Sequence, residues 1–235
     1  MQTVGIKLEL KITNCMHKKN FKSILSFLFV LGFIYLGLFL IIKIAVGKSN
    51  KDDLIDNYED KKKEIHELKN YINLIVPENF NVYVEFISDD KIDIRVSEKT
   101  DSTNDGNILW FEEWNINPYD YKDELHTNYE EYGSKTKSLD VIKKKIKWTD
   151  GTFRELKKRL DLANCISVEN GIKCEIGFKR SMMSKYCYLI FNENLDKKMQ
   201  EKYSDDCMYL FFKENIVFSY YSPAFGSICT SEFKK

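Results

Sequence analysis

An uncharged apolar run near the N-terminus constrains this chain of 235 residues more than any other feature. The run extends from Ser23 to Ile42, reads SILSFLFVLGFIYLGLFLII, and contains 20 residues without a charge. At a rise of about 1.5 Å per residue, a helix of this length spans roughly 30 Å, the thickness of the hydrocarbon core of a bilayer. The rest of the chain is too small and too polar to bury a helix that is apolar on every face. We therefore predict a transmembrane helix.

Two kinds of membrane segment fit this run. Ala45 and Gly47 have the small-x-small spacing of a signal-peptide cleavage site. The apolar core of a signal peptide, however, usually has about 7 to 15 residues, whereas this run is longer and follows a lead of 22 residues. An uncleaved signal anchor over residues 23–47, preceded by a short basic segment over 1–22, is the interpretation that we favour.

The charge of the chain is divided at this anchor. The 36 basic and 36 acidic side chains cancel over the whole sequence. Residues 1–47 carry six lysines against one glutamate, a net charge of +5, and the remaining 188 residues carry 30 basic and 35 acidic groups, a net charge of −5. Five lysines precede the run, whereas Lys43, Lys48 and Lys51 follow it closely and Lys61, Lys62 and Lys63 lie further on. Because positive flanks stay in the cytoplasm, we expect a cytoplasmic N-terminus and an extracytoplasmic C-terminal part.

A long helix is predicted directly after the anchor, within a juxtamembrane segment over 48–77. The helix is predicted to run from about Lys51 to Ile75, and Pro77 ends it. Its stripe follows the 4-3 spacing of a coiled-coil seam. Two alternatives remain open: the stripe packs on the sheet of its own domain, or two copies pair as a parallel homodimer through residues 54–75. The positions of the stripe are Leu54, Tyr58, Lys61, Ile65, Leu68, Ile72 and Ile75.

The remainder, residues 78–235, reads as an α+β domain with a mostly antiparallel sheet and packed helices. Alternating apolar residues predict strands, and apolar residues at a helical period predict helices. A capping box of Thr152 and Glu155 is expected to open one of the helices, and residues 133–138 form a candidate boundary within the domain. The predicted strands are 82–86, 92–96, 108–114, 166–168, 172–178, 186–191, 207–212 and 216–221, and the predicted helices cover 117–129, 139–146, 152–163 and 196–203.

The strand register limits what the cysteines can do. A three-residue loop at Gly171 would pair Val168 with Ile172 and place Cys165 and Cys174 on opposite faces of the sheet, which excludes a disulfide between them. A Cys207–Cys229 bond stays open on geometric grounds. Five cysteines follow the anchor, an odd number that fits a fully oxidised domain poorly.

Residues 101–112, DSTNDGNILWFE, resemble a 12-residue calcium loop of the EF-hand type. Gly106 permits the sharp turn, and the oxygen ligands would be supplied by Asp101, Thr103, Asp105, Asn107 and Glu112. Thr103 is a poor ligand, and the segment that enters the loop reads as a strand rather than a helix. An ordinary polar loop between strands is therefore the favoured interpretation, calcium is the alternative, and no other cofactor is expected.

Aromatic and basic residues are the candidate partner surfaces of the domain. The lysine-rich stretches at 143–147 and 157–159 lie on amphipathic helices of a net acidic domain, so nucleic acid is not an expected partner. If one sheet face is open to a partner, the candidate contact residues are Tyr186, Tyr188, Tyr209, Tyr220 and Tyr221.

No catalytic signature is present in the sequence, which weakens the case for an enzyme without excluding it. The leading hypothesis is a single-pass membrane protein, held in the bilayer by its anchor, whose extracytoplasmic domain binds a protein or cell-envelope partner. The alternative is a membrane-tethered enzyme, a hydrolase or a thiol-dependent enzyme, whose site forms from residues distant in sequence.

Overall fold

The computed structural model describes residues 30–33, 35, 37, 51–99, 110–121, 138–181, 184–204 and 208–221. The chain divides into two compact units, residues 1–48 and 49–235. In the first unit the six described residues are helical, and Val30, Leu31, Phe33 and Tyr35 are between 45% and 75% exposed. Within the described ranges, no helix has the length and apolar character needed to cross a bilayer. Most of the predicted 23–42 span lies outside these ranges.

The described residues of the second unit form one antiparallel sheet of eight strands, which confirms the predicted α+β class. Its spatial order is β3-β2-β1-β4-β5-β6-β8-β7, so that the short strand β4 joins an N-terminal group of strands to a C-terminal group. Sequence on both sides of the candidate boundary at 133–138 therefore contributes to the same sheet. The strands are β1 (Phe80–Phe86), β2 (Ile92–Glu98), β3 (Trp110–Ile116), β4 (Ser167–Glu169), β5 (Lys173–Ser181), β6 (Ser184–Phe191), β7 (Tyr209–Lys213) and β8 (Ile216–Tyr221).

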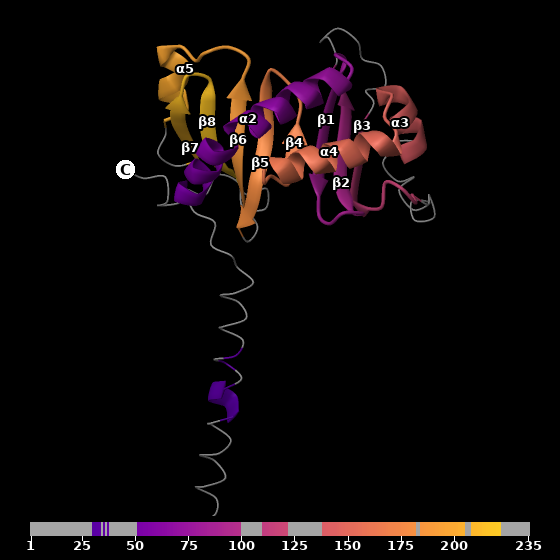
Figure 1. Ribbon diagram of the computed structural model, residues 1–235, viewed down its shortest axis with the longest axis horizontal. Helices are drawn as coiled ribbons and strands as arrows, with labels where there is room; N and C mark the ends of the chain where they lie inside the picture. Colours follow the sequence, from indigo (N-terminus) through magenta and orange to yellow (C-terminus); the bar gives the residue numbers. More distant parts are fainter. Residues whose placement is uncertain are drawn as a thin grey trace, which may run out of the picture. The chain divides into compact units, whose positions relative to one another are not determined.

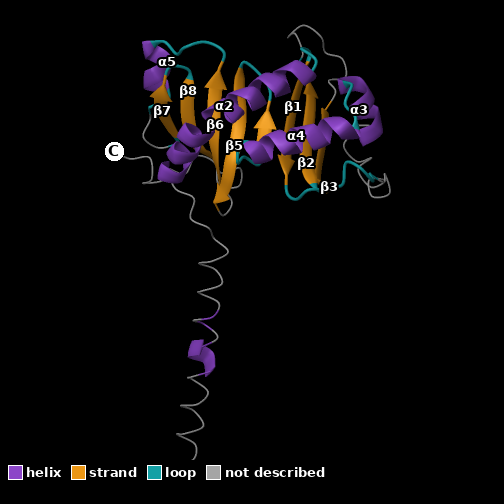
Figure 2. Ribbon diagram, in the orientation of Figure 1, coloured by secondary structure: helices purple, strands orange, loops and turns teal. Residues whose placement is uncertain are grey.

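Two helices, α2 (Lys51–Ile75) and α4 (Asp150–Leu162), cross the same face of this sheet (Figure 1). The shorter helix α3 (Leu139–Ile146) packs into the same core at the β1–β3 end. Helix α5 (Lys197–Lys202) lies at the opposite end of the sheet, beside β7 and β8 (Figure 2). The main core therefore lies between the sheet and the layer of α2 and α4.

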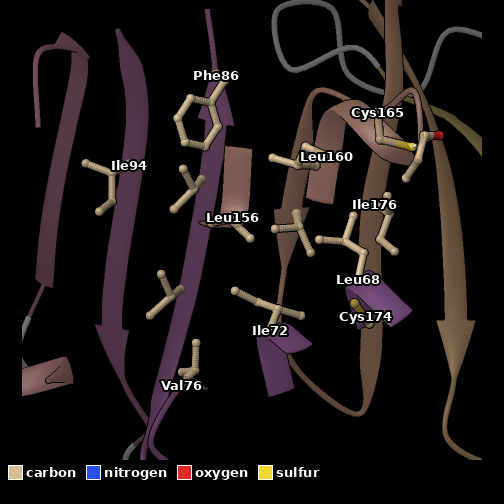
Figure 3. Packing of buried hydrophobic residues seen from close by; sticks show 14 of the residues in the cluster. Leu68, Ile72, Val76, Phe86, Ile94, Leu156, Leu160, Cys165, Cys174 and Ile176 are labelled. Carbon is tan, nitrogen blue, oxygen red and sulfur yellow. Dashed lines mark hydrogen bonds between the residues drawn. The ribbon is translucent and has the colours of Figure 1, made fainter. Parts of the chain in front are cut away.

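The predicted stripe of α2 is buried in this core. Leu54, Tyr58, Ile65, Leu68 and Ile72 have no exposed surface and pack with strand residues such as those labelled in Figure 3. This is the intramolecular alternative of the two that the heptad spacing left open. A parallel dimer through 54–75 stays a prediction, but most of the residues that it needs are already covered by their own domain.

Helix α4 begins earlier than the sequence predicted. The N-cap is Thr149, whose hydroxyl accepts a hydrogen bond from the Thr152 N–H, and the Thr152 hydroxyl accepts one from the Thr149 N–H. Thr152 therefore occupies the third helical position of the capping box instead of the cap itself. Asp150 in the first turn favours this start, because a carboxylate stabilises the positive end of a helix.

The β4–β5 connection also differs from its prediction. Val168 pairs with Ile176 rather than Ile172. Because the pairing shifts by an even number of residues, each side chain of β5 stays on the face of the sheet that was predicted for it. The cause of the shift is Asn170, whose side chain accepts a hydrogen bond from the Val82 N–H at 2.6 Å and donates one to the Phe80 carbonyl at 3.0 Å. Asn170 thereby takes the place of a strand residue beside β1, and the loop has to be wider than a tight turn.

Cys165 and Cys174 lie in the same core, not on opposite faces as predicted (Figure 3). Cys165 precedes β4, so strand alternation does not yet determine where its side chain points. Residues 117–121, where a helix was predicted to begin, form a turn in which the Asn117 side chain accepts a hydrogen bond from the Tyr119 N–H. The rest of that predicted helix, over 122–129, lies outside the described ranges.

Candidate binding surface

The sheet has a second face that points away from α2 and α4. Because side chains alternate along a strand, Val82 and Val84 enter the core whereas Tyr83 and Glu85 point to the other side. Of the described helices, only α5 covers this side, through a small cluster that includes Leu189 and Val217. We call the remainder the polar face; its residues are Tyr83, Glu85, Asp93, Arg95, Trp110, Glu112, Trp114, Ser167, Glu169, Glu175, Gly177, Lys185 and Cys187.

Two tryptophans dominate one edge of the polar face. Trp110 and Trp114 are 57% and 59% exposed, whereas Phe111, next to Trp110 in the chain, is buried in the core. They lie on the edge strand β3 on the same side of the sheet, with Glu112 between them. Large aromatic side chains that stay exposed are typical of surfaces that bind partners.

Arg95 connects this edge to the centre of the face. Its guanidinium lies 5.0 Å from the centroid of the Tyr83 ring and donates a hydrogen bond to Glu169 Oε2 at 3.2 Å. In the strand register, however, Arg95 stands directly opposite Glu112. Because its charge is directed toward Tyr83 and Glu169, Glu112 has no ion-pair partner among the described residues.

The centre of the face is a buried network of charges around Glu85, whose side chain is only 1% exposed. Its carboxylate accepts hydrogen bonds from the Tyr83 hydroxyl and from Arg180 Nε, and Lys185 Nζ lies 3.5 Å away. The same ammonium group donates hydrogen bonds of 3.0 Å to the Tyr83 hydroxyl and to Ser167 Oγ. Every charge of this Glu85 network thus has partners, as burial of an ion requires.

Protonation states show what the network can do chemically. Burial lowers the pKa of Lys185, but its neighbours Cys187, Tyr83 and Glu85 raise this pKa by more, so that the net change is upward. Burial also raises the pKa of Tyr83. A serine next to a neutral lysine could act as a nucleophile with its base, but a protonated Lys185 cannot take the proton of Ser167. The network therefore fixes the strands together and holds the polar face rigid.

The cysteines of the described ranges are equally unsuited to nucleophilic attack. Cys165, Cys174 and Cys187 are buried free thiols. Burial raises the pKa of all three, that of Cys174 to about 12. Thiol catalysis requires the thiolate, which none of these residues forms near neutral pH. Cys207 and Cys229 lie outside the described ranges, and their bond stays a prediction.

A shallow cavity of about 160 Å³ opens beside the network, between β5, β6, β7 and β8. Glu175 lines it and accepts a hydrogen bond from Cys187 Sγ at 3.5 Å. Pockets for small molecules usually enclose about 300 Å³ or more, so this cavity is too small to hold a typical cofactor. The cavity is also lined by Lys173, Leu189, Met208, Tyr209, Ser219 and Tyr220.

The five predicted contact tyrosines do not form one surface. Tyr186 and Tyr188 are fully buried on the side of α2, where the Tyr188 hydroxyl donates to the Leu54 carbonyl. Tyr220 lies on this side as well, with its ring 4.6 Å from that of Tyr186. Tyr209 packs on the opposite side with the α5 cluster, and nothing is described of the Tyr221 side chain. A central strand such as β6 is buried on both faces, which the alternation of its sequence does not reveal.

Of the predicted calcium ligands, only Glu112 lies within the described ranges, on β3. Asp101, Thr103, Asp105 and Asn107 lie outside them. No group of three or more His, Cys, Asp or Glu side chains in the described part of the chain is placed to hold a metal ion. The calcium site therefore stays a prediction.

Sequence reasoning missed the Glu85 network because its members look like ordinary solvent-facing positions. Tyr83 and Glu85 alternate with valines, and their partners Arg180 and Lys185 lie about a hundred positions further along the chain. The one available signal was Lys185 itself. It stands in SKYCYLIF, an otherwise apolar strand, where a lysine needs buried partners.

Comparison of the chain with protein-family models, with curated proteins and with solved structures finds no match in any of the three.

Proposed function

We propose that this protein is a single-pass membrane protein whose extracytoplasmic α+β domain binds a protein or cell-envelope partner through the polar face. In this proposal residues 23–47 are an uncleaved signal anchor, and the N-terminal segment 1–22 is cytoplasmic. The domain follows the anchor directly, because α2 begins at Lys51.

Two observations support the anchor. The run from Ser23 to Ile42 is uncharged over 20 residues. In addition, Val30, Leu31, Phe33 and Tyr35 are helical yet largely exposed. Apolar side chains around a helix without a protein core are stable in hydrocarbon and costly in water.

The observation that carries the binding proposal is the exposure of Trp110 and Trp114 on a rigid sheet face. Exposure of an indole to water costs free energy that is recovered when a partner covers the ring. Tryptophan is also enriched among the residues that dominate binding energy at interfaces. The Glu85 network on the same face joins β1 to β5 and β6, so a partner would meet a preformed surface.

Site-specific photocrosslinking in living cells tests this proposal. A photoreactive amino acid at position 110 or 114 should give a discrete crosslinked partner, because these positions lie on the proposed surface. Positions 74 and 172 are matched controls, since Leu74 and Ile172 are each 82% exposed but lie off the polar face. Equal crosslinking at all four positions, or none at 110 and 114, would overturn the proposal.

The enzyme alternative has no observation in its favour within the described part of the chain. Lys185 is protonated and cannot take the proton of Ser167, and the three described thiols are protonated as well. A hydrolytic or thiol-dependent activity stays a prediction without a site.

A further inference from the structure

We propose that Trp110, Glu112 and Trp114 form a subsite for a cationic side chain of the partner, an arginine in the first place and a lysine in the second. This inference rests on the proposed function and adds the chemistry of the partner. We call these three residues the indole–carboxylate row.

The spacing of the row fits a cation. Side chains at alternate positions of a strand lie about 7 Å apart on one face, so the Glu112 carboxylate lies between the two indoles. A cation paired with Glu112 would come within reach of both ring faces, since cation–π attraction acts to about 6 Å from a ring centroid. Tryptophan is the aromatic side chain that binds cations best.

The charge of Glu112 is available for a partner. Its cross-strand neighbour Arg95 would be the natural counterion, but the Arg95 guanidinium lies over the Tyr83 ring and bonds Glu169 instead. Within the described ranges no other cation pairs with Glu112. An unpaired carboxylate between two exposed indoles attracts a cation and repels an anion, and it would be left without a partner under a purely apolar ligand.

The open shape of the row favours a side chain of a protein over a free small cation. The row does not line the cavity between β5, β6, β7 and β8, and it lies on an edge strand. A small ion on an open surface gains too little binding free energy to offset its lost translational freedom. For a side chain of a docked protein, that cost is shared with the rest of the interface. Arginine fits better than lysine, because its planar group stacks on indole and bonds a carboxylate with two N–H groups.

The test uses the full chain in nanodiscs with EDTA present and measures tryptophan fluorescence. The chain has three tryptophans, and Trp148 is buried, so a ligand on the row changes mainly the signal of the other two. The probe is a Gly-Ser peptide that contains three arginines, and its matched control contains citrulline, which keeps the shape but not the charge. We expect saturable binding of the arginine peptide and at least about tenfold weaker binding of the citrulline peptide.

Variants locate the binding. Glu112→Gln should weaken the arginine peptide about tenfold, and Trp110→Phe should weaken it less than Trp110→Ala does. Glu67→Gln is the matched control, because its side chain is 54% exposed on α2, away from the row. Equal affinity for the arginine and citrulline peptides, or an unchanged affinity in Glu112→Gln, would overturn the inference.

Cellular crosslinking from position 97, in the neighbouring strand, separates this inference from the proposed function. Loss of the partner in both Glu112→Gln and the Trp110→Ala/Trp114→Ala double variant supports the cationic subsite. Loss only in the double variant leaves the polar face as a binding surface but overturns the cationic subsite. A partner retained in all variants overturns both.

Discussion

Gly177 is the residue on which the packing of the Glu85 network depends most directly. A Cβ atom at this position would lie 2.1 Å from Ser167 Oγ and 2.9 Å from Lys185 Cδ. The absence of a side chain thus leaves the space through which Lys185 reaches Ser167 and Tyr83. One backbone position on β5 therefore determines whether a buried lysine finds its partners.

We expect Gly177→Ala to lower the free energy of unfolding by about 1 to 3 kcal/mol, because overpacking displaces Ser167 and Lys185. Urea unfolding followed by fluorescence of the buried Trp148 measures this change. Gly151→Ala is the control, since its nearest atom would be Thr149 Oγ1 at 3.4 Å, an ordinary contact. That variant should be as stable as the wild type or slightly more so. Equal stability of the two variants would contradict this account of Gly177.

His66 should make stability depend on pH. Burial lowers its pKa below the ordinary value of 6.5, Lys69 and Lys62 lower it further, and Glu214 opposes them. As pH falls below 6.5 the unfolded chain takes up a proton before the folded chain does, so stability decreases with falling pH in that window. Nε2 of His66 lies 3.0 Å from the Tyr58 hydroxyl, and a ring protonated at both nitrogens can only donate to that hydroxyl.

The measurement is urea unfolding of the wild type and of His66→Gln at pH 7.5 and pH 5.5. The wild type should lose more stability than the variant between these two values, since the variant lacks the titrating ring. The comparison removes the opposite effect of Asp93 and Glu169, whose pKa values are raised by burial and which both proteins share. An identical loss in the two proteins would show that His66 does not contribute.

At the scale of elements, helix α2 is held to the sheet by hydrogen bonds as well as by its apolar stripe. Asn57 donates to the Tyr188 hydroxyl at 2.9 Å and to the Ala163 carbonyl at 3.3 Å, and it accepts a bond of 2.7 Å from Asn164. A single side chain of α2 thereby joins the end of α4 to strand β6. These hydrogen bonds fix the position of α2 along the sheet. Apolar contacts alone would define that position less sharply, because they are not directional.

Asn57→Ala should lower the free energy of unfolding by about 2 kcal/mol, because it leaves buried polar groups without partners. Asn70→Ala on the same helix is exposed and should change stability by about 0.5 kcal/mol or less. Both are measured by urea unfolding. A loss in Asn57→Ala no larger than in the control would indicate that water replaces these bonds.

Local patterns predicted most elements, because burial on one face leaves a period in the sequence. The stripe of α2, the helix α3 and the strand β3 were predicted in this way. The β4–β5 register was predicted wrongly, because it depends on the bonds from Asn170 to β1, about 90 positions earlier. The contact tyrosines were misplaced for a similar reason: which strands become central is decided by long-range pairing such as that of β1 with β4.

At the scale of the whole molecule, the hydrophobic core lies in the second unit. Within the described ranges, the buried residues of both hydrophobic clusters fall between Leu54 and Phe218. The net charge of −5 on the 188 residues after Gly47 also favours solubility. The division of the chain at the anchor stays a prediction from charge and hydropathy, whereas the order of the strands depends on contacts that no local pattern records.

A fragment of residues 49–235 should therefore be soluble, unfold cooperatively and sediment as a monomer. The last expectation follows from the burial of the α2 stripe in its own domain. Thermal unfolding and analytical ultracentrifugation test it, with the Leu68→Asp variant as a control that should not fold. A folded dimer would contradict the monomer expectation and support pairing through 54–75.

The three buried thiols make it possible to measure unfolding of the domain without an engineered probe. An alkylating reagent cannot label Cys165, Cys174 or Cys187 while the core is closed, because each thiol is both inaccessible and protonated. Labelling of these three positions, read peptide by peptide in a mass spectrometer, therefore counts only molecules that have opened. The rate of this labelling would report how often the domain opens.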